Sequence, residues 1–114
     1  MQKDDYHWHK IADSEKEINL DENGIGVIEM EGRKLCLAKW SDRWFGFSYL
    51  CPHAGGLLSK GYIDASGNVV CPSHHYRFSL LHGRDSAGEG YHMRRWQVEK
   101  REDGIYIGLD GMGF

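Results

Sequence analysis

Two short clips, each pairing a cysteine with a histidine, constrain the fold of this chain more than any other feature. Cys51 and His53 form the first clip, and Cys71 and His74 form the second. Residues 54–70 separate the clips, so the two belong to different parts of the chain. Thiolates and imidazoles are common ligands of zinc and of iron–sulfur clusters, and four of them can close one site. If the clips share a centre, the fold must bring two distant loops side by side.

Before the first clip, runs of apolar and β-branched residues alternate with polar turns, which is typical of antiparallel strands. These runs cover residues 25–30, 34–40 and 44–50. In the third run, Phe45, Phe47 and Tyr49 share one face because side chains alternate along a strand, and we expect that face to enter a core. Residues 8–12 predict an additional edge strand.

The last third of the chain repeats this alternation. Trp96 and Val98 alternate with polar residues, a turn follows at residues 102–104, and Ile105 and Ile107 then begin a second alternating run. No long stretch shows the 3.6-residue period of an amphipathic helix. The sequence therefore predicts an all-β fold, a small antiparallel sandwich or barrel.

Between the two β-blocks, about residues 50–84, the composition shifts toward Gly, His, Ser and Cys. A loop-rich stretch of this length is unusual in a compact domain unless something organises it, and a metal centre would do so. A chain of 114 residues is also within the range of one ordinary domain. We expect a single domain over residues 1–114, with a cluster-binding subdomain at about 50–84 inserted between the blocks.

The clips resemble the Rieske iron–sulfur signature more closely than a zinc finger. A Cys₂His₂ finger has its cysteines in one clip and its histidines in another, beside a helix, whereas each clip here mixes the two types. The resemblance implies one Rieske-type 2Fe–2S cluster per chain, with Cys51 and Cys71 on one iron and His53 and His74 on the iron that changes valence. A structural zinc ion remains the alternative.

The resemblance covers nearly the whole chain, and it implies that further residues adjoin the cluster. These residues are Gly55, Gly56, Ser73, His75 and Tyr76. The two glycines would let backbone N–H groups approach the bridging sulfides, although a plain Gly-Gly turn explains them as well. His75 stands where the family often has glycine, and a surface side chain is the simpler interpretation.

The positions beside the ligands also indicate a subgroup of the family. Members with high potentials carry an extra cysteine in each cluster loop, and the matching positions here are Gly56 and Ser73, so no disulfide can form. Those members also have two hydroxyl donors, matched here by Tyr76 and Phe78. Phe78 has no hydroxyl, so Tyr76 is the one remaining candidate donor. We expect a potential toward the low end of the Rieske range, as in ferredoxins that serve ring-hydroxylating oxygenases.

Composition excludes several other classes of function. The formal net charge is −3, with 14 basic and 17 acidic residues, which argues against a nucleic-acid partner. No apolar run approaches the roughly 20 residues of a membrane helix, and no signal-peptide pattern is visible, so we expect no membrane partner and a cytoplasmic location. The third cysteine, Cys36, lies in an apolar run and is interpreted as a buried core thiol.

These features together predict a one-electron carrier that is not catalytic alone, because no segment remains to hold a mononuclear iron site. The resemblance implies that it accepts electrons from a flavin-dependent reductase and passes them to a terminal oxygenase. Two alternatives stay open. The first is a Rieske-type small subunit of a nitrite reductase, and the second is an interaction module that a metal stabilises without redox chemistry.

Overall fold

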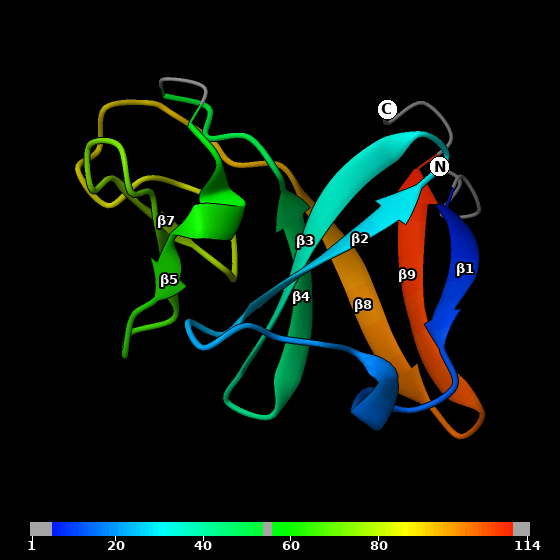
Figure 1. The fold of residues 1–114 in the computed structure, drawn as a ribbon. Coiled ribbons are helices and arrows are strands. Elements are labelled where there is room, and N and C mark those ends of the chain that lie inside the picture. Colours follow the sequence, from blue (N-terminus) through cyan, green and yellow to red (C-terminus); the bar gives the residue numbers. More distant parts are fainter. Residues whose placement is uncertain (1–5, 54–55, 111–114) are drawn as a thin grey trace.

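The computed structural model describes residues 6–53 and 56–110, and the regular secondary structure of these residues is almost entirely β-strand (Figure 1). The strands are β1 (Tyr6–Ala12), β2 (Ile25–Met30), β3 (Arg33–Trp40), β4 (Arg43–Ser48), β5 (Tyr62–Ile63), β6 (Asn68–Val70), β7 (Arg77–Ser79), β8 (Arg95–Arg101) and β9 (Gly104–Asp110). Two single turns of 3-10 helix, η2 (Glu15–Glu17) and η3 (Leu58–Lys60), join them. No helix among the described residues is long and apolar enough to cross a membrane. The all-β prediction is confirmed.

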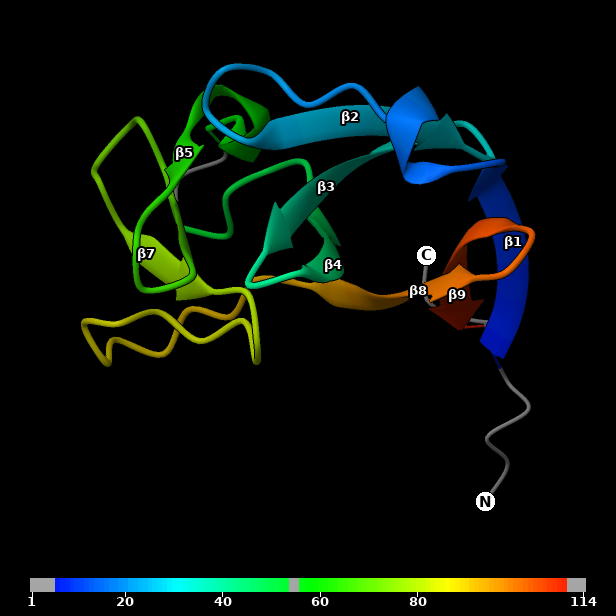
Figure 2. The same ribbon diagram turned by 90° about the horizontal axis from the view of Figure 1, so that it is seen from below.

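Within the described residues, the larger sheet has six antiparallel strands in the order β1-β9-β8-β4-β3-β2. The sheet curls strongly, so that it forms an open, barrel-like shape (Figure 2). The predicted extra strand is β1, and it lies at one edge as expected. We call these six strands the curled sheet.

The hairpins of the curled sheet are tighter than the sequence indicated. Met30 pairs with Arg33 and Trp40 pairs with Arg43, so each turn has two residues instead of three. The turn residues Ser41 and Asp42 both have positive φ angles, of 55° and 63°. Such turns match the right-handed twist of the strands that they join, which explains why β3 and β4 begin one residue early.

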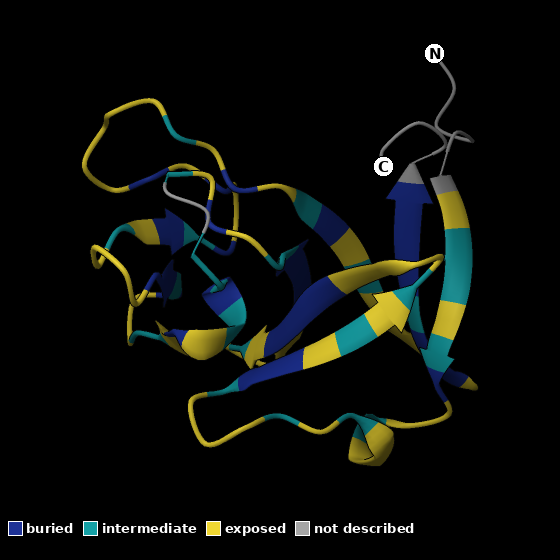
Figure 3. Cartoon of the chain, turned by 45° about the horizontal axis from the view of Figure 1, so that its top comes forward, coloured by how far each residue is buried: buried dark blue, intermediate teal, exposed yellow. Residues whose placement is uncertain are grey.

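Alternate residues of β3 face two separate cores. Leu35 and Leu37 face the inside of the curled sheet, whereas Cys36 and Ala38 face the opposite side. All four side chains are buried. Figure 3, which colours the chain by burial, shows stretches of buried residues in dark blue along the curled sheet. A strand covered on both faces needs apolar residues at every position, which is why this stretch of the sequence is continuously apolar.

The first core, which we call the barrel core, fills the curled sheet. Its buried residues are Leu35, Leu37, Trp96, Ile107 and Leu109. The second, the interface core, lies between the curled sheet and the segment that carries the clips. Its buried residues are Ile25, Cys36, Ala38, Phe45, Phe47, Cys51, Leu58, Val69, Cys71, Phe78, Leu80 and Met93. Both clip cysteines therefore belong to a hydrophobic core.

The expected core face of β4 and the buried thiol of Cys36 are both present in the interface core. Phe45 and Phe47 are buried, and Tyr49 packs partly buried against the same cluster. Cys36 is fully buried, and this burial raises the pKa of its thiol to about 12. A thiol with so high a pKa is uncharged at neutral pH and is inert as a nucleophile or ligand.

The segment between β4 and β8, residues 49–94, forms a second lobe beside the curled sheet (Figure 1). It contains a second antiparallel sheet in the order β5-β6-β7. Its strands span only two or three residues, so the alternation that reveals a strand in sequence is too short to read. Isolated bridges from Phe78 to Asp85 and from Arg84 to His92 extend this lobe toward β8.

Candidate metal centre

The two clips lie in two loops of the same construction. The first loop, residues 51–56, is enclosed by the bridged pair Leu50 and Leu57. The second loop, residues 71–76, joins β6 to β7. Each loop therefore has six residues and starts with its cysteine. The fold brings the loops together even though they are far apart in the sequence.

A backbone hydrogen bond closes each loop in the same way. The N–H of Cys51 donates to the carbonyl of Gly56 at 2.7 Å, and the N–H of Cys71 donates to the carbonyl of Tyr76 at 2.9 Å. In both loops the bond joins the cysteine to the residue five positions later. These bonds hold each cysteine at the base of its loop, at the border of the interface core.

The four proposed ligands differ in burial according to their type. The cysteines are 2% (Cys51) and 1% (Cys71) exposed, whereas His53 is half-buried and His74 is exposed. The two imidazole rings meet edge to face, with centroids 4.9 Å apart. An inner pair of thiols and an outer pair of imidazoles fits a cluster with a cysteine-bound iron inside and a histidine-bound iron outside.

His53 provides a direct test of whether these residues fit a metal. Its Nδ1 atom is buried and has no hydrogen-bond partner among the described residues. Leaving a buried polar atom unpaired costs about 1–3 kcal/mol, so such atoms are uncommon. A coordinated iron would satisfy the lone pair on this nitrogen. The donor set and this atom therefore fit a Rieske-type cluster.

A structural zinc site places four ligands around a single ion. A Rieske centre requires only two protein ligands at each iron, because bridging sulfides complete the coordination. The division of the ligands into an inner and an outer pair follows this second plan.

Gly56 and Ser73 face one another across the two loops. A Cβ atom placed on Gly56 would lie 3.4 Å from the Cβ of Ser73 and would also meet its Oγ. The first separation is close to the Cβ–Cβ distance of a disulfide, which agrees with the disulfide positions that the sequence resemblance assigned to these residues. With glycine and serine here, the loops approach closely without a covalent link. Gly55, the other predicted glycine, lies outside the described residues.

His75 adopts a left-handed backbone conformation, with a φ angle of 62°. Its N–H donates to the carbonyl of Cys71 at 2.9 Å, and its side chain is exposed. Glycine adopts such angles without strain, whereas a residue with a side chain does so less readily. The backbone angle thus explains the family's preference for glycine, and the exposed imidazole agrees with the interpretation of a surface residue.

Tyr76 was the candidate donor to the cluster, but its hydroxyl has another partner. It donates to the Glu89 carboxylate at 2.6 Å, and this hydrogen bond raises the pKa of Tyr76 to about 12. The ring of Tyr76 stacks on His53. Phe78, the other position compared with the donors, is fully buried and has no hydroxyl. Neither position supplies an available hydroxyl donor.

Sequence reasoning missed the segment at residues 85–91, which reaches the first loop through Tyr91. The Asp85 side chain accepts hydrogen bonds from the N–H groups of Glu89 at 3.0 Å and Tyr91 at 2.9 Å. Burial acts to raise the pKa of Asp85, but these and neighbouring N–H groups outweigh it and hold the pKa below its usual value. A charged Asp85 therefore organises this turn. An Asp followed by small and polar residues was the available signal.

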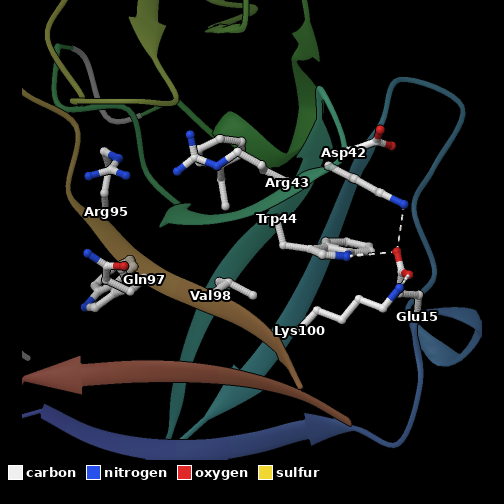
Figure 4. A pocket seen from close by; sticks show the side chains of 11 residues that line it. Glu15, Asp42, Arg43, Trp44, Arg95, Gln97, Val98 and Lys100 are labelled. Atoms are coloured by element: carbon white, nitrogen blue, oxygen red, sulfur yellow. Dashed lines mark hydrogen bonds and ion pairs between the residues drawn. The ribbon is translucent and has the colours of Figure 1, made fainter. Parts of the chain in front are cut away.

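A separate cavity of about 320 Å³ lies on the curled sheet and includes none of the proposed ligands (Figure 4). There Glu15 accepts hydrogen bonds from Lys39 Nζ at 2.7 Å, from Trp44 Nε1 at 3.1 Å and from Lys100 Nζ. These partners lower the pKa of Glu15 to about 2, the bond from Lys100 having the largest effect. Glu15 thus ties η2 to β3, β4 and β8, which is a structural role.

Comparisons with known proteins agree with this geometry. The family model of the Rieske [2Fe-2S] domain matches residues 7–93. No curated protein matches the chain in sequence. Among solved structures, the ferredoxin of carbazole 1,9a-dioxygenase from Nocardioides aromaticivorans IC177 is similar, with a TM-score of 0.72 and 22% identity over 88% of this chain and 95% of that one.

Two further structures share the fold. A protein described as an NADH-dependent nitrite reductase small subunit from Mycobacterium tuberculosis has a TM-score of 0.75 and 16% identity, over 91% of this chain and 96% of that one. A chain in the complex of reduced oxygenase and oxidized ferredoxin in carbazole 1,9a-dioxygenase has a TM-score of 0.72 and 21% identity, over 91% and 93%. At these identities the likeness shows a common fold.

Proposed function

This chain belongs to the Rieske [2Fe-2S] domain family, and on that basis we propose that it carries single electrons by means of a 2Fe–2S cluster. We assign Cys51 and Cys71 to the inner iron and His53 and His74 to the outer iron. In this proposal one domain spans the chain, and residues 50–84 act as its cluster-binding part. Gly55, Gly56, Ser73, His75 and Tyr76 adjoin the cluster.

The observation that carries this assignment is the buried, unpaired Nδ1 of His53, in a pair of loops that also holds two buried thiols. A buried imidazole nitrogen without a hydrogen-bond partner is costly in an apolar setting. This nitrogen and the two thiols belong to the two clips. They come from loops with identical backbone closure, so the geometry prepares both loops to present ligands to one site.

The cluster, when bound, supplies a one-electron centre whose histidine ligands place its potential above that of all-cysteine clusters. The protein residues control access to that centre. The interface core keeps water away from Cys51 and Cys71, which stabilises their bonds to metal. His74 is exposed, so one ligand of the site lies at the surface where a redox partner approaches.

We further propose that the chain accepts electrons from a flavin-dependent reductase and delivers them to a terminal oxygenase, without catalysing a reaction itself. In support, one similar structure is a complex of an oxygenase with a ferredoxin, and another is a ferredoxin of the same kind of system.

The test is EPR spectroscopy of anaerobically purified protein before and after reduction with dithionite, with iron and zinc measured on the same sample. A rhombic signal that appears only after reduction, with a lower average g-value than all-cysteine clusters give, is the expected result. One zinc and no iron per chain, even after anaerobic reconstitution of the cluster, would contradict electron transfer. That outcome would favour an interaction module stabilised by a metal.

A nitrite reductase small subunit is the second candidate, and the similarity to the Mycobacterium tuberculosis protein favours it. The two candidates share the cluster but differ in the acceptor. Co-purification with a sirohaem protein, and electron transfer to it from the reduced chain, would select this second candidate. The first candidate, an electron carrier to an oxygenase, would be selected if an oxygenase with a mononuclear iron site reoxidises the reduced chain. The oxygenase's own substrate should then increase the rate of reoxidation.

A further inference from the structure

The ring of Tyr76 covers the imidazole of His53. Their centroids lie 4.0 Å apart with 14° between the ring planes, which is a stacked arrangement. Tyr91 meets both rings edge-on, at 5.0 Å from His53 and 5.5 Å from Tyr76. Stacked and edge-to-face pairs are the favourable geometries for aromatic rings. His53 therefore lies against two tyrosines, whereas His74 is exposed.

Tyr76 is itself anchored at its far end. Its hydroxyl donates to the Glu89 carboxylate at 2.6 Å. The backbone of Glu89 is in turn held by the Asp85 side chain, which is only 7% exposed and also binds the backbone of Tyr91. The turn at residues 85–91 thus supplies both the anchor for Tyr76 and the second ring against His53.

We propose that Tyr76 is a positioning residue for the ligand His53, and that Glu89 fixes Tyr76 in place by accepting its hydroxyl hydrogen bond. This inference rests on the ligand set in the proposed function. Tyr76 restrains the plane of the imidazole and, with it, the orientation of the buried Nδ1 atom. A ligand whose orientation is set before the metal binds loses less conformational freedom on binding.

The same contacts separate this role from that of a donor to the cluster. A hydroxyl that donates to Glu89 has used its one hydrogen, so it does not donate to a cluster sulfur. Tyr76 then affects how firmly the cluster is held, through its ring, and leaves the redox potential largely unchanged. If the Tyr76 hydroxyl instead donated to the cluster, its removal would change the redox potential and leave the rate of cluster loss largely unchanged.

Four variants of the cluster-loaded protein test this proposal. Tyr76→Leu removes the ring and the hydroxyl, Tyr76→Phe removes the hydroxyl alone, and Glu89→Ala removes the anchor. Tyr106→Leu is the matched control, because the Tyr106 hydroxyl also donates to an exposed carboxylate, that of Asp103, at 2.9 Å on the curled sheet. The measurements are the rate of cluster loss to a chelator, the EPR line width and the midpoint potential.

We expect Tyr76→Leu to speed cluster loss roughly 2- to 10-fold, the range that one aromatic stacking contact gives, and to broaden the EPR lines. Tyr76→Phe and Glu89→Ala should speed the loss by a smaller factor, and Tyr76→Phe should leave the midpoint potential unchanged. Tyr106→Leu should match the wild type.

The proposal is overturned if Tyr76→Leu matches the wild type, or if Tyr106→Leu has an equal effect. If Tyr76→Phe lowers the midpoint potential and does not change the rate of cluster loss, Tyr76 is a donor to the cluster. That result would overturn the positioning role. If Tyr76→Leu takes up no cluster, Tyr76→Phe and Glu89→Ala test the proposal in its place. Cluster loss at the wild-type rate in both variants would then overturn it. A wild-type chain that binds no iron would contradict the proposed function itself, which is a separate and recognisable result.

Discussion

The curled sheet and the second lobe differ in what holds their backbones in place. In the curled sheet, strands of six to eight residues pair over most of their length, and alternate side chains fill the barrel core. Two ion pairs and one hydrogen bond of Glu15 then tie the connection before β2 to three of those strands. Burial of apolar surface and a continuous ladder of hydrogen bonds suffice for such a structure.

The second lobe has strands of two or three residues and long connections between them. It shares the interface core with the curled sheet, yet two of the residues that it contributes are the thiols of Cys51 and Cys71. Small structures with so few paired strands commonly depend on a metal for stability. The chain thus combines the curled sheet, which is stable through packing, with the second lobe, which we expect a bound cluster to stabilise.

The largest effect should come from removing a ligand. Cys71→Ser should lower the affinity for iron by more than about 100-fold, since even changes to residues that only support a ligand cost 10- to 100-fold. Hydrogen exchange should then increase across residues 49–94, while the curled sheet stays protected. Exchange that rises equally in both regions would contradict the proposed division.

Leu37→Ala should affect the curled sheet by a large amount that does not depend on the cluster. Leu37 is fully buried in the barrel core, and removing such a side chain typically costs about 2–5 kcal/mol. Urea unfolding of the protein with and without iron should give the same loss of stability in both forms. A loss seen only in the iron-bound form would show that the two regions are not separable.

Glu15→Gln should destabilise the curled sheet less than Leu37→Ala does, because its partners are near the surface and such ion pairs are screened. The pKa of Glu15 is lowered from 4.5 to about 2 in the folded chain. The stabilisation is therefore complete above pH 4.5 and is lost as the pH falls toward 2. Unfolding at several pH values should show this dependence in the wild type.

The control for this measurement is Glu22→Gln, which changes an exposed carboxylate. Glu15→Gln should remove part of the pH dependence between 4.5 and 2, and Glu22→Gln should retain it. Equal pH dependence in both variants would show that the Glu15 ion pairs do not stabilise the fold.

The smallest effect is expected at His75, in the second lobe. Its left-handed backbone favours glycine, but glycine also loses more conformational freedom on folding, so the two effects largely cancel. His75→Gly should change the free energy of unfolding by no more than about 1 kcal/mol. His75→Asn, which tolerates the same angle, serves as the control. A change of several kcal/mol on His75→Gly would assign the imidazole a larger role than its exposure suggests.

The strands of the curled sheet were readable from the sequence because they are long enough to show alternation. Residues 25–30 match β2, and Trp96 and Ile105 begin the alternating patterns of β8 and β9. The turns were each placed one residue too long, since the two-residue geometry depends on strand twist rather than on composition. β5, β6 and β7 were missed because two or three residues carry no usable period.

Residue type and spacing by themselves determined the candidate ligands and the all-β class of this protein. A thiol and an imidazole have their chemistry wherever they occur, and the alternation of a strand is a local property of the chain. The contacts of Tyr76 with His53 and Glu89 were decided by the tertiary structure alone. They join the first loop, the second loop and the turn at residues 85–91, and only the folded path of the backbone brings these three segments together.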